Sequence, residues 1–421
     1  MLPALNAYRL VLGNRPFRLL WTNQILLQLS FHMVNFSLVL RAWQLTQSNT
    51  ATGLVIVALV LPAILFGVFA GIFADTIDRK RIIVVTTLLL TASFLSFAFI
   101  RDILGIVLFV AFLMSSINQF FMPAEAAAIP MLVKKKELLA AQSLFALTLY
   151  ATFLLGYAIA GPLMIVFGND VPFFIAAIAV AIGSFLVLRL PSLAVRVQER
   201  GDLFSRTKTQ ILESIAFIQT HRFVSVPILL LTILQMAVGI VASLTPGFMV
   251  RVVDVSEKAA SLIVMLPTGI GMVVGAILIG QLTKTLARRI VVARAIMIAG
   301  FVFLLMTLSP LLFVTFLHIQ LIVPPLLFFL SILLGGAAAS VQVISMTVLQ
   351  EHTPLALKGR VFATLNMAIS GVALIPVMLA AGVADLVGLV PVLLTVGSFV
   401  VLVGLIASRT RFVREHVLNT T

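Results

Sequence analysis

The sequence GIFADTIDRK at residues 71–80 decides the fold, because the same pattern returns in the other half of the chain as GQLTKTLARR at residues 280–289. Each stretch has a glycine, a charged residue four positions later, and a basic pair beginning four positions after that. The residues that share this pattern are Gly71, Asp75, Arg79 and Lys80 in the first copy and Gly280, Lys284, Arg288 and Arg289 in the second. A duplicated membrane unit is the simplest explanation of the repeat.

The composition excludes an ordinary soluble enzyme. Of the 421 residues, 62% are hydrophobic and 10% are charged, whereas soluble domains have about 45–50% apolar and about 25% charged residues. The mean hydropathy is +1.21. An all-α polytopic membrane protein is therefore expected.

Long apolar runs predict twelve membrane spans in two sets of six. The first domain is residues 1–191, residues 192–222 form a cytoplasmic linker, and residues 223–421 form the second domain. In the long run at 312–349 we expect the tenth span to begin at Pro324-Pro325. The spans are expected at about 17–40, 52–74, 82–100, 104–123, 138–167, 172–190, 223–250, 259–283, 290–309, 312–349, 360–384 and 388–408.

The basic residues support this map. With both termini in the cytoplasm, 24 of the 28 Lys and Arg fall on the cytoplasmic side. Only Arg41, Arg101, Arg251 and Lys258 fall on the other side. Cytoplasmic loops of membrane proteins carry an excess of Lys and Arg, and a wrong span count would scramble the sorting. We therefore expect a protein of the cell (inner or cytoplasmic) membrane.

With these features the chain resembles a major facilitator superfamily transporter, whose signature loop between spans two and three matches Gly71, Asp75, Arg79 and Lys80. Three further stretches resemble the drug-exporter branch that includes macrolide efflux and enterobactin exporters. They are Asn14-Arg15-Pro16-Phe17-Arg18 with Trp21, Pro123-Ala124 followed by Ile129-Pro130-Met131-Leu132-Val133, and Lys358-Gly359-Arg360-Val361-Phe362. The resemblance implies two pseudo-symmetric six-helix bundles that work by alternating access.

The sequence departs from that pattern at three places. Span four has Ser115-Ser116-Ile117-Asn118-Gln119 where many antiporters carry a basic residue. The span-five motif survives as Gly156, Gly161 and Pro162. The second loop copy has Lys284 where the first has Asp75. These departures leave proton coupling open.

The loop at Gly71 is interpreted as a cytoplasmic gate. Gly71 would let two helices approach closely, and Asp75 would pair with Arg79 or face the amino end of another helix. The alternative is a basic loop that only sets the topology.

Polar stripes mark a candidate substrate cavity. In span one, the polar residues Gln24, Gln28, His32 and Asn35 lie within about 80° of arc, so they share one face of the helix. In the family that the chain resembles, spans one, four, seven and ten line the cavity. The alternative for any single residue is hydrogen bonding between helices. The candidates are Gln24, Gln28, His32 and Asn35; Ser115, Asn118, Gln119 and Met122; Gln235, Gly239 and Ser243; and Gln342, Ser345 and Met346.

Two of the titratable residues are candidates for proton coupling. His32 lies deep in span one and has an ordinary pKa near neutrality, although a neutral histidine bonded between helices is an equal alternative. Glu125 lies near the cytoplasmic end of span four. A residue there commonly extends to the interface instead.

These observations predict a secondary active exporter of an amphipathic or hydrophobic small molecule, with proton antiport as one option. An uncoupled lipid or lysophospholipid flippase is the alternative, and a non-transporting receptor is a weaker one. The sequence has no cysteine and no ATP-binding loop, and its five histidines do not cluster. We expect a monomer in contact with membrane lipids, and no enzyme activity, cofactor, metal or nucleic-acid partner.

The topology is testable with single cysteines, because the chain has none of its own. A cysteine at Asp170 should react with an impermeant thiol reagent outside intact cells, and one at Ser205 should react only after lysis. Labelling of Ser205 but not Asp170 from outside would contradict the span map.

Overall fold

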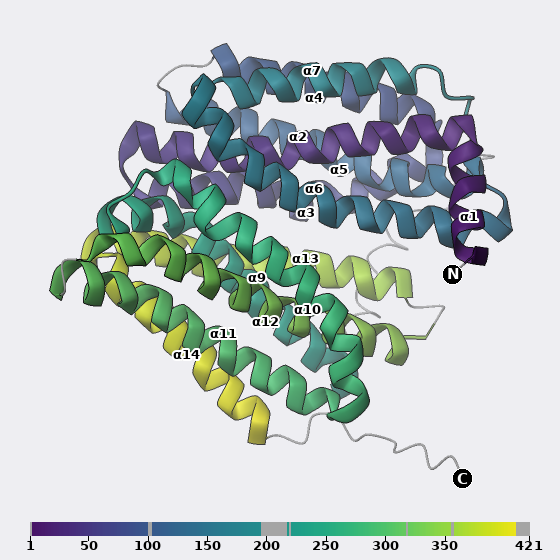
Figure 1. The fold of residues 1–421 in the computed structure, drawn as a ribbon. Coiled ribbons are helices and arrows are strands. Elements are labelled where there is room, and N and C mark those ends of the chain that lie inside the picture. The colour runs from purple at the N-terminus through teal and green to yellow at the C-terminus, as the bar shows by residue number, and fades with distance from the viewer. Residues whose placement is uncertain are drawn as a thin grey trace, which may run out of the picture. The chain divides into compact units, whose positions relative to one another are not determined.

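The computed structural model describes residues 2–99, 103–194, 217–218, 220–316, 319–354 and 358–409, and these ranges contain helices and no strand. Among the described residues, eleven helices are long and apolar enough to cross a membrane, and the 17-residue α7 (Val171–Val187) is a shorter apolar helix. Each of the twelve predicted spans therefore corresponds to one helix of the described residues. Figure 1 labels these helices. Most of the predicted linker lies outside the described residues.

The chain divides into two compact units. The first is Met1–Gln47 with Leu54–Leu203, and the second is Ser48–Gly53 with Phe204–Thr421. The helices of the first unit are α1 (Leu2–Gly13), α2 (Arg15–Thr46), α3 (Asn49–Thr76), α4 (Arg79–Phe99), α5 (Leu104–Leu132), η1 (Lys135–Glu137), α6 (Leu138–Phe167) and α7. The first turn of α3 is an exception, because Asn49–Gly53 belongs to the second unit.

The second unit contains the other six long helices and several short turns. The long helices are α9 (Arg222–Phe248), α10 (Leu266–Thr285), α11 (Arg288–Pro310), α12 (Val323–His352), α13 (Lys358–Val387) and α14 (Leu389–Arg409). The short elements are η2 (Met249–Val253), η3 (Glu257–Ala259), η4 (Ser261–Met265), η5 (Leu311–Phe316) and η6 (Gln320–Ile322). Helix α12 begins with Val323 and Pro324, as predicted from the proline pair.

Local sequence explains where α2 begins. The Asn14 side chain accepts a hydrogen bond from the backbone N–H of Phe17 at 3.3 Å, and Pro16 occupies the first turn. This is the favoured arrangement of a helix start. The Asn14 amide also donates to the carbonyl of Leu132 at the end of α5, at 2.6 Å. Further along α2, Trp21 donates to the Thr148 hydroxyl of α6 at 2.8 Å. The segment at 14–21 therefore joins three helices.

Glycines allow α2 to lie against two neighbours. A Cβ placed on Gly156 of α6 would be 2.7 Å from the Cβ of His32, and a Cβ on Gly183 of α7 would be 2.5 Å from the Oδ1 of Asn23. Small residues let helix backbones approach where the membrane gives no hydrophobic drive for association.

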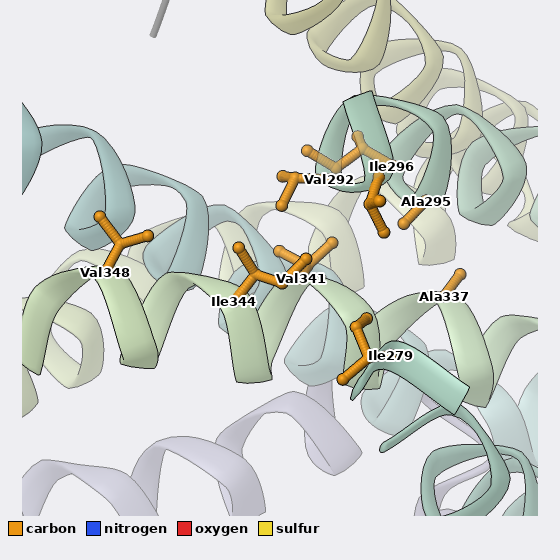
Figure 2. Packing of buried hydrophobic residues seen from close by; sticks show 9 residues of the cluster. Ile279, Val292, Ala295, Ile296, Ala337, Val341, Ile344 and Val348 are labelled. Carbon is orange, nitrogen blue, oxygen red and sulfur yellow. The ribbon is translucent and has the colours of Figure 1, made fainter. Parts of the chain in front are cut away.

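In the second unit the closest approach is between α10 and α12. A Cβ on Gly271 would collide with the carbonyl of Ile332, and a Cβ on Gly335 with the carbonyl of Thr268. Gly335 begins a run of small residues at 335–340, which allows α12 to pack closely against α10. Beside this contact, α10, α11 and α12 share a core of aliphatic side chains, shown in Figure 2, with Ile279, Val292, Ile296, Val341, Ile344 and Val348 among its members.

The duplication extends to a pair of turns. Gly168 lies between α6 and α7 with φ +103, and Gly388 lies between α13 and α14 with φ +96. Residues other than glycine rarely adopt these backbone angles. The two halves thus use glycine at the same point, between their fifth and sixth spans.

Gly335→Ala should destabilise the protein by about 1–3 kcal/mol, the usual cost of overpacking, because its new methyl group meets backbone rather than a movable side chain. Gly336→Ala is the matched control, since a Cβ there lies 3.5 Å from the Gly271 carbonyl oxygen, an ordinary contact. Thermal unfolding of the two variants in detergent measures the difference. Equal melting temperatures for both would contradict the proposed contact.

Candidate functional site

The polar face of α2 meets α5 and α6 inside the first unit. Gln24 and Gln28 are buried. The Gln24 amide is 3.4 Å from the carbonyl of Phe145 in α6, and the Gln28 amide is 3.7 Å from the sulfur of Met122 in α5. Gln24 therefore contacts α6 and Gln28 contacts α5, which the sequence alone could not predict.

His32 lies among aromatic rings rather than among charges. Its ring centroid is 5.2 Å from that of Phe153 and 5.8 Å from that of Tyr157, both in α6. Gly156, between these two residues in the chain, gives the room for His32 to pack there. Gly161 and Pro162 continue α6 beyond this contact, with Gly161 buried and Pro162 inside the helix. Asn35, one turn further along α2, is partly buried and its Oδ1 has no hydrogen-bond partner among the described residues.

The candidates on α5 have different surroundings. Ser115 donates a hydrogen bond to the carbonyl of Leu59 in α3, so it joins two helices. Asn118 is buried and its Oδ1 lacks a partner within the described structure. Gln119 is partly buried, and Met122 is 43% exposed.

Glu125 is buried, with 5% of its surface exposed, instead of extending to the interface. Its Oε1 has no hydrogen-bond partner among the described residues. The contacts of Asn14 with Leu132 and of Gln28 with Met122 show that α2 and α5 run antiparallel. Glu125 is three residues from Met122, so it lies within about one helical turn of the level of Gln24. The Oε1 of Gln24 is likewise buried without a partner in the described part of the chain.

These unpartnered oxygens define the candidate site. Buried polar atoms normally find a partner, so a group of exceptions calls for a ligand, water or proton to satisfy them. The α2–α5 polar cluster, as we call it, consists of Gln24, Asn118 and Glu125, which carry these oxygens, together with Gln28, whose amide contacts Met122. It offers amides and one carboxyl group in an apolar surrounding, which suits a weakly polar ligand.

The candidates of the second unit lie against its own helices. On α9, Gln235 is exposed, Gly239 packs against Val377 of α13, and the carbonyl of Ser243 accepts a hydrogen bond from the Thr52 hydroxyl at 2.6 Å. On α12, Gln342 is partly buried and Met346 packs against a small core that includes Ile228 and Leu349. Ser345 is buried, its hydroxyl has no partner among the described residues, and it lines a cavity with α9, α11 and α14.

The loop at Gly71 has one of its two predicted contacts. The Asp75 carboxylate lies 3.9 Å from the Arg79 guanidinium, and Asp75 is exposed whereas Arg79 is mostly buried. The expected close approach at Gly71 is wrong for this structure, because a Cβ there, or at Gly280, would meet no described atom within 4 Å. Arg79 instead extends to α5, where its guanidinium lies 2.9 Å from the sulfur of Met131.

Asp78, which the sequence analysis passed over, is the residue that fixes this loop. Its carboxylate accepts hydrogen bonds from the N–H of Lys80 at 2.9 Å, the Ser192 hydroxyl at 2.7 Å and the N–H of Leu193 at 3.1 Å. Partial burial alone would raise the pKa of Asp78, but these bonds and the charge of Arg81 lower it. Because the folded pKa is the lower one, this stabilisation is present at neutral pH and is lost as the pH falls below the ordinary value of 3.8.

In the second copy of the loop, the ion pair joins two helices instead of two residues of the same loop. Arg288, at the start of α11, lies 2.6 Å from the Glu351 carboxylate near the end of α12. Arg289 beside it is exposed. The Lys284 side chain lies outside the described residues. Within the described ranges, no group of three or more acidic or histidine residues is arranged to hold a metal ion.

The sequence profile of the Major Facilitator Superfamily matches residues 20–323. The chain belongs to this superfamily. A search of curated protein sequences found no match.

Three solved structures with the same fold are transporters. The nucleoside transporter NupG has a TM-score of 0.73 at 14% identity, with 93% of this chain and 99% of that chain covered. A POT family transporter in complex with 5-aminolevulinic acid has a TM-score of 0.74 at 11% identity, covering 93% and 95%. Another, in complex with a thioalcohol-conjugated peptide, has 0.72 at 12% identity with the same coverage. These likenesses show the fold, and the chain is a membrane transporter of the major facilitator type.

Asp385, another residue that the sequence analysis passed over, organises one end of this transporter. Its carboxylate accepts hydrogen bonds from Ser48 and from the first turn of α3, at 2.6–2.9 Å from each donor. The donors are the Ser48 hydroxyl, the backbone and side-chain nitrogens of Asn49, and the backbone nitrogen and hydroxyl of Thr50. A carboxylate at a helix amino terminus also interacts favourably with the helix dipole. One acidic side chain in α13 therefore holds the first turn of α3 in the second unit.

Asp385→Asn should lower the free energy of unfolding by about 1.5 kcal/mol, the lower end for hydrogen bonds to charged groups, because water reaches this carboxylate. Asp254→Asn is the matched control, since the Asp254 carboxylate accepts one long bond, 3.4 Å from the Gln320 amide. Thermal unfolding in detergent measures both. An unchanged melting temperature for Asp385→Asn would show that the hydrogen bonds of Asp385 contribute nothing to stability.

Proposed function

We propose that the chain is a secondary active exporter of an amphipathic or hydrophobic small molecule, working by alternating access and related to the drug-exporter branch of the superfamily. The observation that carries the proposal is the α2–α5 polar cluster, which combines amides and one buried carboxyl group with aromatic neighbours at His32. A phosphorylated or dicarboxylate substrate would need several Arg or Lys side chains as partners, and the candidate residues include none.

The motif residues have different roles in this proposal. The loop at Asp75 and Asp78 acts as the cytoplasmic gate, because it ties α4 to the segment after α7 and to α5. Both termini are cytoplasmic, and the protein works as a monomer in the cell membrane without a cofactor.

Proton coupling has two candidates in the first unit. A charged carboxylate is costly to keep in an apolar surrounding without a cation, and Glu125 has no ion pair among the described residues. Binding of a proton or of a cationic amphipath at Glu125 would remove that cost. His32 contacts aromatic rings, so its imidazole has a packing role whether or not it carries a proton.

Flux measurements in proteoliposomes test the function. With an imposed pH gradient, a panel of cationic drugs, siderophores and lysophospholipids is screened for substrate-dependent proton movement. Drug or siderophore movement against protons supports the exporter. Movement of a lysophospholipid without protons would replace it with the uncoupled flippase, which the missing basic residue in span four favours. No movement of any compound would overturn the proposed substrate class.

Glu125→Gln should abolish proton-driven accumulation while downhill exchange of the substrate continues, because the amide keeps hydrogen-bonding atoms but does not titrate. His32→Gln is measured in parallel. Selective loss of coupling in His32→Gln alone would assign the proton to His32. Full proton-driven transport in both variants would contradict coupling at either residue. A joint loss of exchange and thermal stability in His32→Gln would identify a packing role.

A further inference from the structure

The second unit contains a cavity that the transport proposal does not use. Its volume is about 230 Å³, and it lies between α9, α11, α12 and α14. Its walls are apolar side chains, among them Phe223, Leu230, Val292, Ile344, Val403 and Ile406. Val292 and Ile344 also belong to the core in Figure 2, so the inner wall of the cavity is fixed by packing. Phe223, Leu229 and Ile406 are 38%, 56% and 52% exposed, so the cavity reaches the lipid-facing surface.

The cavity is not a general consequence of a six-helix unit. In the first unit the corresponding helices, α2 and α7, pack closely along their length, with Gly183 against Asn23. In the second unit α9 and α14 meet only marginally. The first and sixth spans of the first unit therefore pack against each other, whereas the equivalent helices of the second unit are separated by the cavity.

Two arginines stand at the mouth of the cavity. Arg288 and Arg289 both line it, and both lie in the first turn of α11. The amino end of a helix carries partial positive charge, so two guanidinium groups there produce a strongly positive site. Glu351 offsets one of the charges through its contact with Arg288. The remaining charge favours an anion at the mouth.

The wall of the cavity includes one buried serine hydroxyl without a hydrogen-bond partner among the described residues. Ser345 is 2% exposed and lines the cavity, and its hydroxyl has no hydrogen-bond partner among the described residues. A buried hydroxyl without a partner points to a ligand acceptor in the cavity. The ester carbonyl of a phospholipid, which lies between its phosphate and its acyl chain, is such an acceptor.

The dimensions fit one acyl chain. The wall residues of α9 extend from Phe223 to Ile233, about 15 Å at 1.5 Å per residue. This is about half of the hydrocarbon thickness of a bilayer, so it equals one leaflet. The volume exceeds that of a cavity that holds benzene, about 150 Å³, and is below the roughly 300–1,000 Å³ of pockets for drug-sized ligands.

We propose that this cavity binds an anionic phospholipid of the adjacent leaflet, with one acyl chain between α9 and α14 and the phosphate at Arg288 and Arg289. The lipid is a resident ligand of the second unit and not the transported molecule. Because lipid tails gain little by leaving other tails, the charged headgroup supplies the selectivity. The site goes beyond the transport proposal and is tested without any transport measurement.

Native mass spectrometry of the full-length protein tests the headgroup. Phosphatidylglycerol should bind at least several-fold more tightly than phosphatidylcholine of the same chains, and Arg289→Gln should remove most of that difference. Lys135→Gln is the matched control, since Lys135 is an exposed basic residue of the first unit, and it should leave binding unchanged. Equal binding of the two lipids, or an equal effect of the two variants, would overturn the anionic site.

Photolabelling of the wild-type protein tests the acyl chain. Phosphatidylglycerol with a diazirine on one chain, in vesicles of phosphatidylcholine, should label residues of α9, α12 and α14 that line the cavity. Excess unlabelled phosphatidylglycerol should suppress this labelling, and Val403→Phe, which fills the cavity, should reduce it. Labelling spread evenly over lipid-facing helices would overturn the bound chain and leave only attraction at the surface. Suppression by a transport substrate instead of by the lipid would make the cavity a substrate site.

Discussion

Helices inside a membrane gain no hydrophobic energy by leaving lipid for one another, and this constraint governs how both units are built. Association then depends on close backbone contact and on a few hydrogen bonds. The α10–α12 pair shows the first, with Gly271 and Gly335 each facing a backbone carbonyl of the other helix. Asp385 shows the second, because its carboxylate binds three successive residues at the start of α3.

The same constraint explains why polar residues are few and why their places matter. Most serine and threonine hydroxyls of the helices bond to carbonyls in their own helix, as Thr86 and Thr152 do. The exceptions are the informative groups. Gln24, Asn118 and Glu125 carry buried atoms without partners among the described residues, and they lie on α2 and α5. Buried polar atoms without a partner are costly, so we propose that a ligand, water or proton satisfies these groups.

Sequence reasoning predicted the helices well because span length, proline position and the sorting of basic residues are local signals. Val323-Pro324 starts α12 where expected, and the repeat at Gly71 and Gly280 identified the duplication. It failed where a residue's partner is far along the chain. Nothing near Asp385 shows that it binds Asn49, because the two residues are more than 330 positions apart. Asp78 was overlooked because its partners, Ser192 and Leu193, follow another helix. Close approach of helix backbones occurs at Gly335, which faces backbone, and not at Gly71, where a Cβ would meet no described atom within 4 Å.

A disulfide between α3 and α13 tests the alternating-access account most directly. The first turn of α3 belongs to the second unit and the rest of α3 to the first. If α3 moves as one rigid helix in the proposed cycle, this turn must leave α13. A Cβ on Gly53 would lie 2.9 Å from that of Ala381, which is shorter than the roughly 3.5–4.5 Å Cβ spacing in disulfides. A small shift of the two helices is therefore needed before the bond can form. The chain has no cysteine of its own. Gly53→Cys with Ala381→Cys should stop substrate exchange in proteoliposomes when oxidised and restore it when reduced, while each single variant remains active under both conditions. Undiminished exchange by the fully cross-linked protein would contradict the account.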